Sequence, residues 1–190
     1  MLFAYFLIFF FLCFFVPSIR VYYRTKKNPL VFKKSESAHD LIGFYMKIII
    51  LSVLLSTALS FFTDFHITEL LTFKYQKEMG TFLLVFALMW IIIAQAQMSN
   101  SWRIGIDESE RTELVTWGVF RYSRNPIFLG ILIALFGMLI LEFNFLNLIY
   151  FVLTFVLVNV QVRLEEDYLL KTHSEVYLSY KNKTPRWLIL

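Results

Sequence analysis

The sequence predicts an all-α integral-membrane bundle of five transmembrane helices. Of the 190 residues, 58% are hydrophobic and 19% are aromatic, with 22 phenylalanines among them, and the mean hydropathy is +0.65. A soluble domain of this length cannot bury so much apolar surface, so most of that surface must face lipid. A one-sided distribution of lysine and arginine between the apolar segments supports the same class.

Five apolar segments account for the five helices: residues 2–16, 41–62, 80–98, 127–141 and 146–160. About 20 helical residues are needed to span a hydrocarbon core of roughly 30 Å. The second and third segments reach this length alone, the first must continue through Pro17, and the last two need flanking residues. No Gly or Pro ends the fifth segment, so we expect its helix to continue through residues 161–171.

The chain divides into two regions by its segments. Residues 1–98 form an N-terminal three-helix membrane region, and residues 99–190 hold two transmembrane helices, the loop that precedes them and a C-terminal segment. There is no internal repeat, low-complexity linker or separate soluble domain. The first apolar segment has no basic residue before it and no small-x-small site after it, so we interpret it as a retained helix rather than a signal peptide.

The positive charges lie almost entirely on one side of the bundle. If the five helices cross the membrane in alternating directions, 15 of the 18 lysines and arginines fall on one side. They are Arg20, Arg24, Lys26, Lys27, Lys33, Lys34, Arg103, Arg111, Arg121, Arg124, Arg163, Lys171, Lys181, Lys183 and Arg186. The opposite loops hold Lys74 and Lys77. Because cytoplasmic loops are rich in lysine and arginine, we expect an external N-terminus, in a cell inner membrane.

Several site classes are excluded by missing motifs. The single cysteine, Cys13, allows no intrachain disulfide, and His39, His66 and His173 have no metal-ligand spacing. The sequence contains no GxGxxG, GxxxxGK[ST], HExxH or GxSxG motif. No basic groove interleaved with aromatics lies outside the apolar runs, so a nucleic-acid partner is not expected despite a pI of about 9.1.

Two polar clusters flank the last helical hairpin on the basic side. The first, residues 118–130, contains an Asn125-Pro126 turn that begins a helix and leaves backbone N–H groups free for an electron-rich ligand. The second contains Glu165 and Glu166, which point about 100° apart on a helix, so that at most one lines a given pocket well. Each cluster also has a plain structural interpretation, as a helix start and as a solvated helix end.

The C-terminal tail, residues 173–187, is aromatic and basic. Trp187 and the apolar residues after it can anchor the chain in the membrane interface. The tail can equally fold over the Asn125-Pro126 turn as a lid, and spacing leaves both arrangements open.

Taken together, these residues form a pattern that resembles the isoprenylcysteine carboxyl methyltransferase family and the related phospholipid N-methyltransferases. The family hallmark is an Arg-His-Pro-x-Tyr turn, a hydrophobic span and a Glu-Glu pair. The likeness covers roughly residues 102–185. It is carried by Leu114-Val115-Thr116, Gly118-Val119-Phe120, Arg124-Asn125-Pro126-x-Phe128-x-Gly130, Glu165-Glu166-x-x-Leu169, Tyr177-x-x-Tyr180 and Pro185.

The resemblance implies an integral-membrane methyltransferase that uses S-adenosylmethionine in a cytoplasm-facing pocket of short helices and loops, without a Rossmann domain. The acceptor would be a carboxylate, amine or thiol on an amphipathic or lipid-like molecule. Arg163 would orient this acceptor. An amine acceptor needs a deprotonated nitrogen, and Glu166 or a neighbour would then be the candidate proton acceptor. The implied cofactor-binding residues are Thr112, Glu113, Leu114, Val115, Phe120, Arg124, Asn125, Pro126, Ile127, Phe128, Glu165 and Tyr177. Aromatic faces among them could stabilise the sulfonium by about 0.5–2 kcal/mol.

This chain departs from the family pattern at a few positions. Asn125 stands where the family usually has His, and Phe120 and Phe128 stand where it usually has Tyr. Gln161 occupies the register of an arginine tied to the acceptor, with Arg163 offset by about half a turn. These differences concern the acceptor more than the cofactor.

Two other functions remain open from the sequence. A sterol-reductase type of membrane enzyme shares a related C-terminal architecture and uses a nicotinamide cofactor, although such enzymes have more spans than 190 residues provide. A non-enzymatic membrane scaffold would use the polar clusters only to anchor helix ends.

Overall fold

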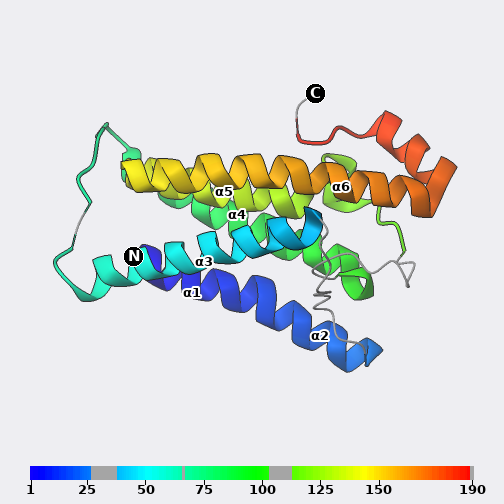
Figure 1. The fold of residues 1–190 in the computed structure, drawn as a ribbon, viewed down its shortest axis with the longest axis horizontal. Helices are drawn as coiled ribbons and strands as arrows, with labels where there is room; N and C mark the ends of the chain where they lie inside the picture. Colours follow the sequence, from blue (N-terminus) through cyan, green and yellow to red (C-terminus); the bar gives the residue numbers. More distant parts are fainter. Residues whose placement is uncertain (27–37, 66, 103–112, 189–190) are drawn as a thin grey trace.

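The protein is a bundle of antiparallel helices (Figure 1). The computed structural model describes residues 1–26, 38–65, 67–102 and 113–188, and every regular element in these ranges is helical. The elements are α1 (Leu2–Phe10), η1 (Phe11–Phe15), α2 (Val16–Thr25), α3 (Ala38–Phe62), α4 (Gln76–Met98), η2 (Ser99–Ser101), η3 (Gly118–Arg121), α5 (Pro126–Leu141) and α6 (Phe145–Lys183). Since α1, η1 and α2 follow one another without a break, the described residues form five helical rods, and the predicted all-α membrane fold is confirmed.

Four of the rods are long and apolar enough to cross a bilayer: Leu2–Thr25, α3, α4 and α6. The remaining rod, α5, has 16 residues. At 1.5 Å per residue it is about 24 Å long, which is shorter than the roughly 30 Å hydrocarbon core. Polar groups at the ends of so short a helix lie close to the hydrocarbon and must find partners within the protein.

The longest rod, α6, extends well beyond the membrane. Its 39 residues correspond to about 58 Å, roughly twice the thickness of the hydrocarbon core. Residues 145–162 carry no charge, and the charged residues begin at Arg163, so the acidic pair lies outside the membrane-spanning part. The predicted continuation through residue 171 is confirmed and reaches Lys183, after a kink at Ser174 (φ 45°, ψ −118°) that bends the last turns back (Figure 1).

The first rod continues through Pro17, as full spanning length requires. Proline has no N–H to donate to the carbonyl four residues earlier, which belongs to Cys13. The chain passes this point as a π-helical turn, η1, and the amide of Gln95 on α4 donates to the Cys13 carbonyl at 2.7 Å. Arg20 in turn donates to the Gln95 carbonyl at 2.9 Å. A cross-helix side chain thus replaces the hydrogen bond that Pro17 removes.

Helices α4 and α5 approach each other closely because glycines line their contact. A Cβ atom added at Gly80 would lie 2.7–2.8 Å from backbone and Cβ atoms of Leu141. On the facing helix, a Cβ at Gly137 would lie 3.1 Å from the backbone N of Leu84. Backbone atoms cannot swing away as a flexible side chain can. This contact fixes α5, and with it the Asn125-Pro126 turn at its N-terminus, against α4.

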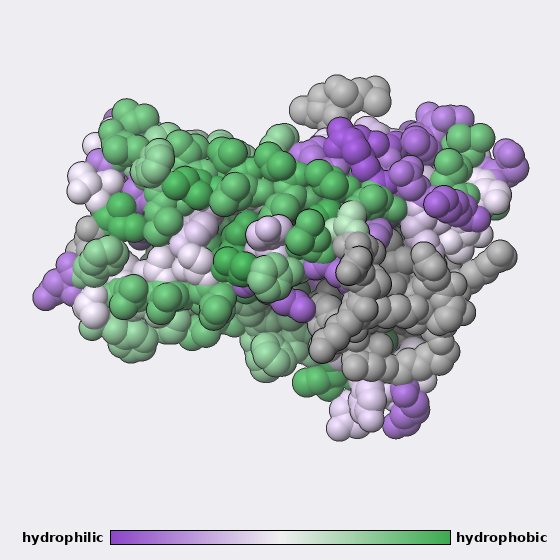
Figure 2. Space-filling model, in the orientation of Figure 1, coloured by the Kyte–Doolittle hydropathy of each residue, from purple (hydrophilic) through white to green (hydrophobic). Residues whose placement is uncertain are grey.

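The surface of the bundle separates into an apolar body and a polar end. In Figure 2, hydrophobic side chains cover most of the visible body, and hydrophilic ones gather over the charged part of α6. At this polar end, Arg24 on α2 donates to the Ser99 hydroxyl after α4 (3.5 Å) and so joins the ends of the first and third membrane-spanning helices. The alternating helix directions bring the described basic segments to the same end, which identifies a multi-pass membrane protein with one basic face.

We predict that Gly80→Ala lowers the free energy of unfolding by about 1–3 kcal/mol, because the new methyl group overlaps the α5 backbone. Thermal unfolding in detergent measures the effect. Gly43→Ala on α3 is the matched control, since nothing lies within 4 Å of its added Cβ, and it should be neutral or slightly stabilising. Equal stability of the two variants would contradict the close α4–α5 contact.

Candidate functional site

Side chains of α4 hydrogen-bond to the Asn125-Pro126 turn and to the segment before it. Gly118 adopts a positive φ of 64°, which opens the short helix η3, and Gln97 accepts from the Val119 N–H at 2.9 Å. The indole N–H of Trp90 donates to the Pro126 carbonyl at 3.0 Å. Asn125 is the residue before α5, yet its side chain does not cap the helix. Its amide is therefore free to point elsewhere.

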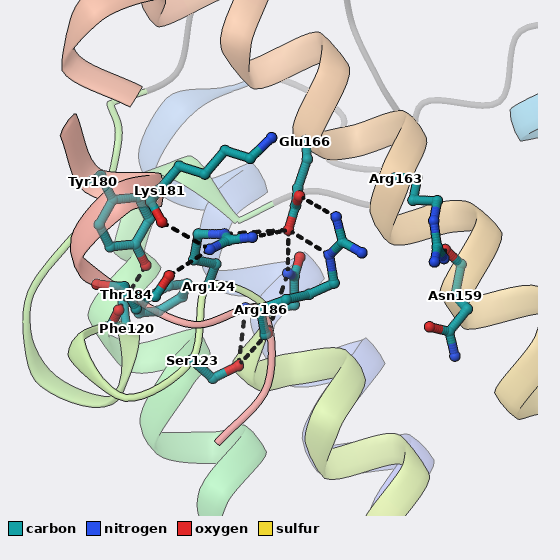
Figure 3. A network of polar contacts seen from close by, with 11 residues as sticks. Phe120, Ser123, Arg124, Asn159, Arg163, Glu166, Tyr180, Lys181, Thr184 and Arg186 are labelled. Carbon is teal, nitrogen blue, oxygen red and sulfur yellow. Dashed lines mark hydrogen bonds and ion pairs between the residues drawn. The ribbon is translucent and has the colours of Figure 1, made fainter. Parts of the chain in front are cut away.

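After the kink, α6 leads into residues 184–187, which we call the C-terminal strap. The strap lies across the Asn125-Pro126 turn (Figure 3). The Arg124 N–H donates to the Pro185 carbonyl at 3.0 Å, and the Ser123 hydroxyl donates to the Arg186 carbonyl at 3.0 Å. Close by, the Tyr180 hydroxyl donates to the Phe120 carbonyl at 2.6 Å. Of the two arrangements open from the sequence, the tail adopts the one that folds over the turn.

Glu166 lies at the centre of the polar contacts in Figure 3. Its Oε1 accepts from Nε and an Nη of Arg124 at 3.2 and 3.0 Å and from the Asn125 amide at 3.2 Å. Arg186 of the strap donates to both carboxylate oxygens, at 3.1 and 2.8 Å. Glu166 is only 3% exposed. Residues about 20 and 42 positions away in the sequence thus meet at one buried carboxylate, and we call this group the Glu166 network.

The charges of the Glu166 network decide its protonation. Burial acts to raise the pKa of Glu166, but the hydrogen bonds and positive charges of Arg186 and Arg124 outweigh it and hold the pKa below its usual range. The hydrogen bond to Glu166 raises the pKa of the Arg186 guanidinium. Both partners therefore stay ionised. A carboxylate with a lowered pKa and both oxygens occupied is a poor proton acceptor.

The other member of the acidic pair points to a different neighbour. The Glu165 carboxylate accepts from the Gln161 amide at 2.9 Å, and the Gln161 Oε1 lies 3.3 Å from Nδ1 of His39 on α3. Because successive helical residues turn by 100°, Glu165 and Gln161 share the α3-facing side of α6 while Glu166 faces the α5 turn. The two adjacent acids thus serve two separate groups of residues.

Apolar clusters adjoin both groups. Leu132, Val158 and Val162 form a buried cluster between α5 and α6, against which Met46, Phe128 and Trp187 pack. A second cluster joins the turn to the end of α4. Its members are Ala94, Val119 and Phe120, with Trp90, Met98, Val115 and Ile127 packed against them. The predicted residues Phe120, Ile127 and Phe128 therefore lie in apolar surroundings beside the polar groups.

A groove of about 490 Å³ opens on the strap side of α6. Arg163 lies there, exposed, and donates to the Asn159 carbonyl one turn earlier at 2.6 Å. Arginine and lysine dominate the wall. The lining residues are Arg124, Asn159, Arg163, Lys181, Asn182, Lys183, Thr184, Pro185, Arg186 and Trp187. Arg163 thus lies on a different side of α6 from Gln161, which joins α3.

The remaining predicted residues are distributed as follows. Tyr177 is 1% exposed, and its hydroxyl makes no hydrogen bond to the described part of the chain. Burial, and next the charge of Glu166, raise the pKa of Tyr177, so it stays protonated. Pro126 is buried, Leu114 and Val115 are half-buried, and Glu113 is exposed. Thr112 lies outside the described residues.

Some residues of this region were not assigned from the sequence. Arg186 was noted only as part of a basic tail, because the kink at Ser174 that returns it to Glu166 contains no Gly or Pro. His39 was considered only for metal spacing, since no motif surrounds it. Ser123 directly precedes Arg124-Asn125-Pro126, and this position in the sequence could have suggested its contact with the strap.

Comparison with known proteins identifies the family. The family model described as phospholipid methyltransferase matches residues 75–176, more than half of the chain. The chain belongs to the phospholipid methyltransferase family. The predicted relationship is thereby confirmed, and the protein is a membrane methyltransferase. Neither the curated proteins nor the solved structures gave a match.

The phospholipid methyltransferase match covers only part of the contacts described above. It includes the Asn125-Pro126 turn, the acidic pair and most of α6. It leaves out α3 with His39 and the strap with Arg186. Both halves of the family pattern meet in the Glu166 network, and two segments outside the match complete the region around them.

We predict that Glu166→Gln lowers the free energy of unfolding by about 3–5 kcal/mol, because it leaves the charges of Arg124 and Arg186 without their carboxylate. Denaturant titration in detergent micelles measures the loss. Asp167→Asn is the control, an exposed acid at the next position. Adding Arg186→Gln to Glu166→Gln should recover part of the loss, and a fully additive double variant would contradict the network.

We also predict a loss of stability in acid. The folded-state pKa of Glu166 is lowered, so the unfolded chain binds more protons over this range and stability rises with pH. The contribution is complete above the ordinary glutamate pKa of about 4.3 and is lost as pH falls below it through the folded-state value. Thermal midpoints in acidic buffers measure the slope. The slope should be shallower in Glu166→Gln, and an unchanged slope would show that other groups cause it.

Proposed function

We propose that this membrane methyltransferase takes its methyl group from S-adenosylmethionine and transfers it to a lipid-like acceptor at the polar end of the bundle. The observation that carries the proposal is the set of hydrogen bonds from Arg124 and Asn125 to Glu166. They join the Arg-Asn-Pro turn to the acidic pair, the two halves of the pattern by which the chain resembles isoprenylcysteine carboxyl methyltransferases. A fixed turn and a fixed helix are what cofactor binding needs.

The residues at this end fit S-adenosylmethionine chemically. The buried Tyr177 hydroxyl has no partner in the described part of the chain and can bond a polar group of the cofactor. Phe120 and Phe128 offer aromatic faces that attract a sulfonium. When bound, S-adenosylmethionine supplies a methyl group activated by its sulfonium, so the protein need only align and desolvate the reactants, which can contribute roughly 7–11 kcal/mol.

The two glutamates have different roles in this proposal. Glu165 binds the cofactor, where its carboxylate can accept from an ammonium or a ribose hydroxyl. Glu166 positions the turn and the strap, because its oxygens are already occupied and its pKa is lowered. This assignment keeps the proposed cofactor role of Glu165 and replaces the proton-accepting role first considered for Glu166.

The acceptor is proposed to lie on the α3-facing side of α6. There the partly buried Met46 and Phe128, which pack against the cluster of Val158 and Val162, can contact a hydrocarbon chain. Gln161 stands at the register of the family's acceptor-binding arginine. Arg163, the other candidate, lies on the strap side. We therefore predict that Gln161→Leu raises the KM for the acceptor more than Arg163→Leu does. The reverse order would move the acceptor to the groove.

The orientation follows from the charge distribution. The protein lies in the inner membrane of the cell. Its basic end, which carries the proposed site, faces the cytoplasm, and its N-terminus lies on the external side. Acceptor molecules would then reach the site from the cytoplasmic half of the bilayer, while the water-soluble cofactor arrives from the cytoplasm.

Binding of labelled S-adenosylhomocysteine, the demethylated product, tests the proposal without knowledge of the acceptor. The purified protein in detergent should bind it saturably, and Glu165→Gln should weaken binding at least about tenfold, equivalent to about 1.4 kcal/mol. Asp167→Asn should leave the affinity unchanged, and a thermal midpoint equal to that of the native chain shows that each variant is folded. Absence of saturable binding, or stabilisation by NADPH alone, would refute the proposal and favour a reductase.

A further inference from the structure

A short polar chain links α3 to α6 beside the proposed acceptor position. It consists of Glu165, Gln161 and His39, with contacts of 2.9 and 3.3 Å between them. His39 is half-buried in the first turn of α3, and α3 lies outside the family match. Neither the family pattern nor the Glu166 network explains why a histidine is held there.

The contacts among Glu165, Gln161 and His39 determine which nitrogen of His39 carries the proton. The amide NH₂ of Gln161 donates to the Glu165 carboxylate. The Gln161 Oε1 therefore faces His39 and can only accept, which requires the proton on Nδ1. In the neutral ring, Nε2 is then left with its lone pair. This nitrogen makes no hydrogen bond to the described part of the chain.

His39 also lies at the boundary between polar and apolar surroundings. Met46, seven residues later and on the same face of α3, packs against the apolar cluster of α5 and α6. His39 is therefore about two turns nearer the polar end than that cluster. An amphipathic molecule with its hydrocarbon chain against the cluster would bring its polar head to the level of the imidazole.

Two other titratable groups at this end of the bundle, Glu166 and Tyr177, are unsuited to taking a proton. Glu166 has a lowered pKa and occupied oxygens. Burial raises the pKa of Tyr177, which keeps its hydroxyl protonated. The neutral tautomer of His39 with its proton on Nδ1 instead leaves a lone pair on Nε2 that can take a proton.

We infer that His39 is a further catalytic residue, whose Nε2 accepts the proton of the methyl acceptor. The N–H bond of a protonated amine, or the S–H bond of a thiol, breaks, and its electron pair stays on the nitrogen or sulfur as the nucleophile. A new N–H bond forms at Nε2, from which water removes the proton. The inference rests on the proposed methyl transfer. It selects an amine or a thiol as the acceptor, because a carboxylate has no proton to remove.

The first test reads the tautomer and needs no activity. In ¹⁵N spectra of histidine-labelled protein in alkaline buffer, His39 should show the Nδ1–H form, and His66→Gln with His173→Gln leaves it as the one remaining histidine. Gln161→Leu should shift His39 toward Nε2–H. An Nε2–H form in the unaltered chain would overturn the inference.

The second test measures transfer of labelled methyl groups from S-adenosylmethionine into a total lipid extract. His39→Ala should bind S-adenosylhomocysteine normally but lose kcat by about 10²-fold or more, the usual contribution of a general base, and added imidazole should restore part of the rate. His173→Ala is the control and should keep full activity. Full activity of His39→Ala, or a methyl ester as product, overturns the inference while leaving the proposed function intact. Failure of the unaltered protein to bind S-adenosylhomocysteine refutes the proposed function instead.

Discussion

A single buried carboxylate, Glu166, holds the polar end of this protein together. It accepts hydrogen bonds from the turn before α5 and from the strap after α6, and it balances one of the two positive charges that meet there. A carboxylate that is 3% exposed can remain ionised only with such partners. The turn, the strap and the far part of α6 therefore depend on one another, and none of them can move without leaving a buried charge.

The bilayer explains why this interaction lies where it does. Helix α5 is too short to span the hydrocarbon core, whereas α6 is about twice as long as spanning requires. The excess length of α6 carries the acidic pair and, through the kink at Ser174, returns the chain over the N-terminus of α5. Backbone groups at the Asn125-Pro126 turn thereby receive protein partners near the membrane boundary, where unpaired polar groups are costly.

Much of the fold could be predicted from the sequence because its signals are local. Apolar length identified the helices, the positions of lysine and arginine indicated one basic end, and the absence of Gly or Pro after residue 160 indicated a long α6. The Arg-Asn-Pro turn and the acidic pair were recognised through their order and spacing. The family match bears out that recognition, and the individual site residues remain proposals.

Contacts that depend on three-dimensional arrangement could not be predicted in the same way. Arg186 reaches Glu166 only because the helix kinks at a serine with positive φ, for which the sequence has no distinctive signal. Helical spacing indicated that Glu165 and Glu166 diverge, but it could not say which of them faces α5. The contact between His39 and Gln161 joins residues 122 positions apart, and no pattern in a single sequence marks such a pair.

Transfer of the methyl group itself tests the central claim most directly. Membranes that contain the protein, incubated with S-adenosylmethionine labelled in the methyl group, should produce a labelled lipid that membranes lacking it do not. Mass analysis of that product would identify the acceptor and its methylated atom. A labelled lipid that disappears with Glu165→Gln and persists with Asp167→Asn is the result expected for a methyltransferase site at the polar end of this bundle. No protein-dependent labelling of the lipid extract would contradict the account.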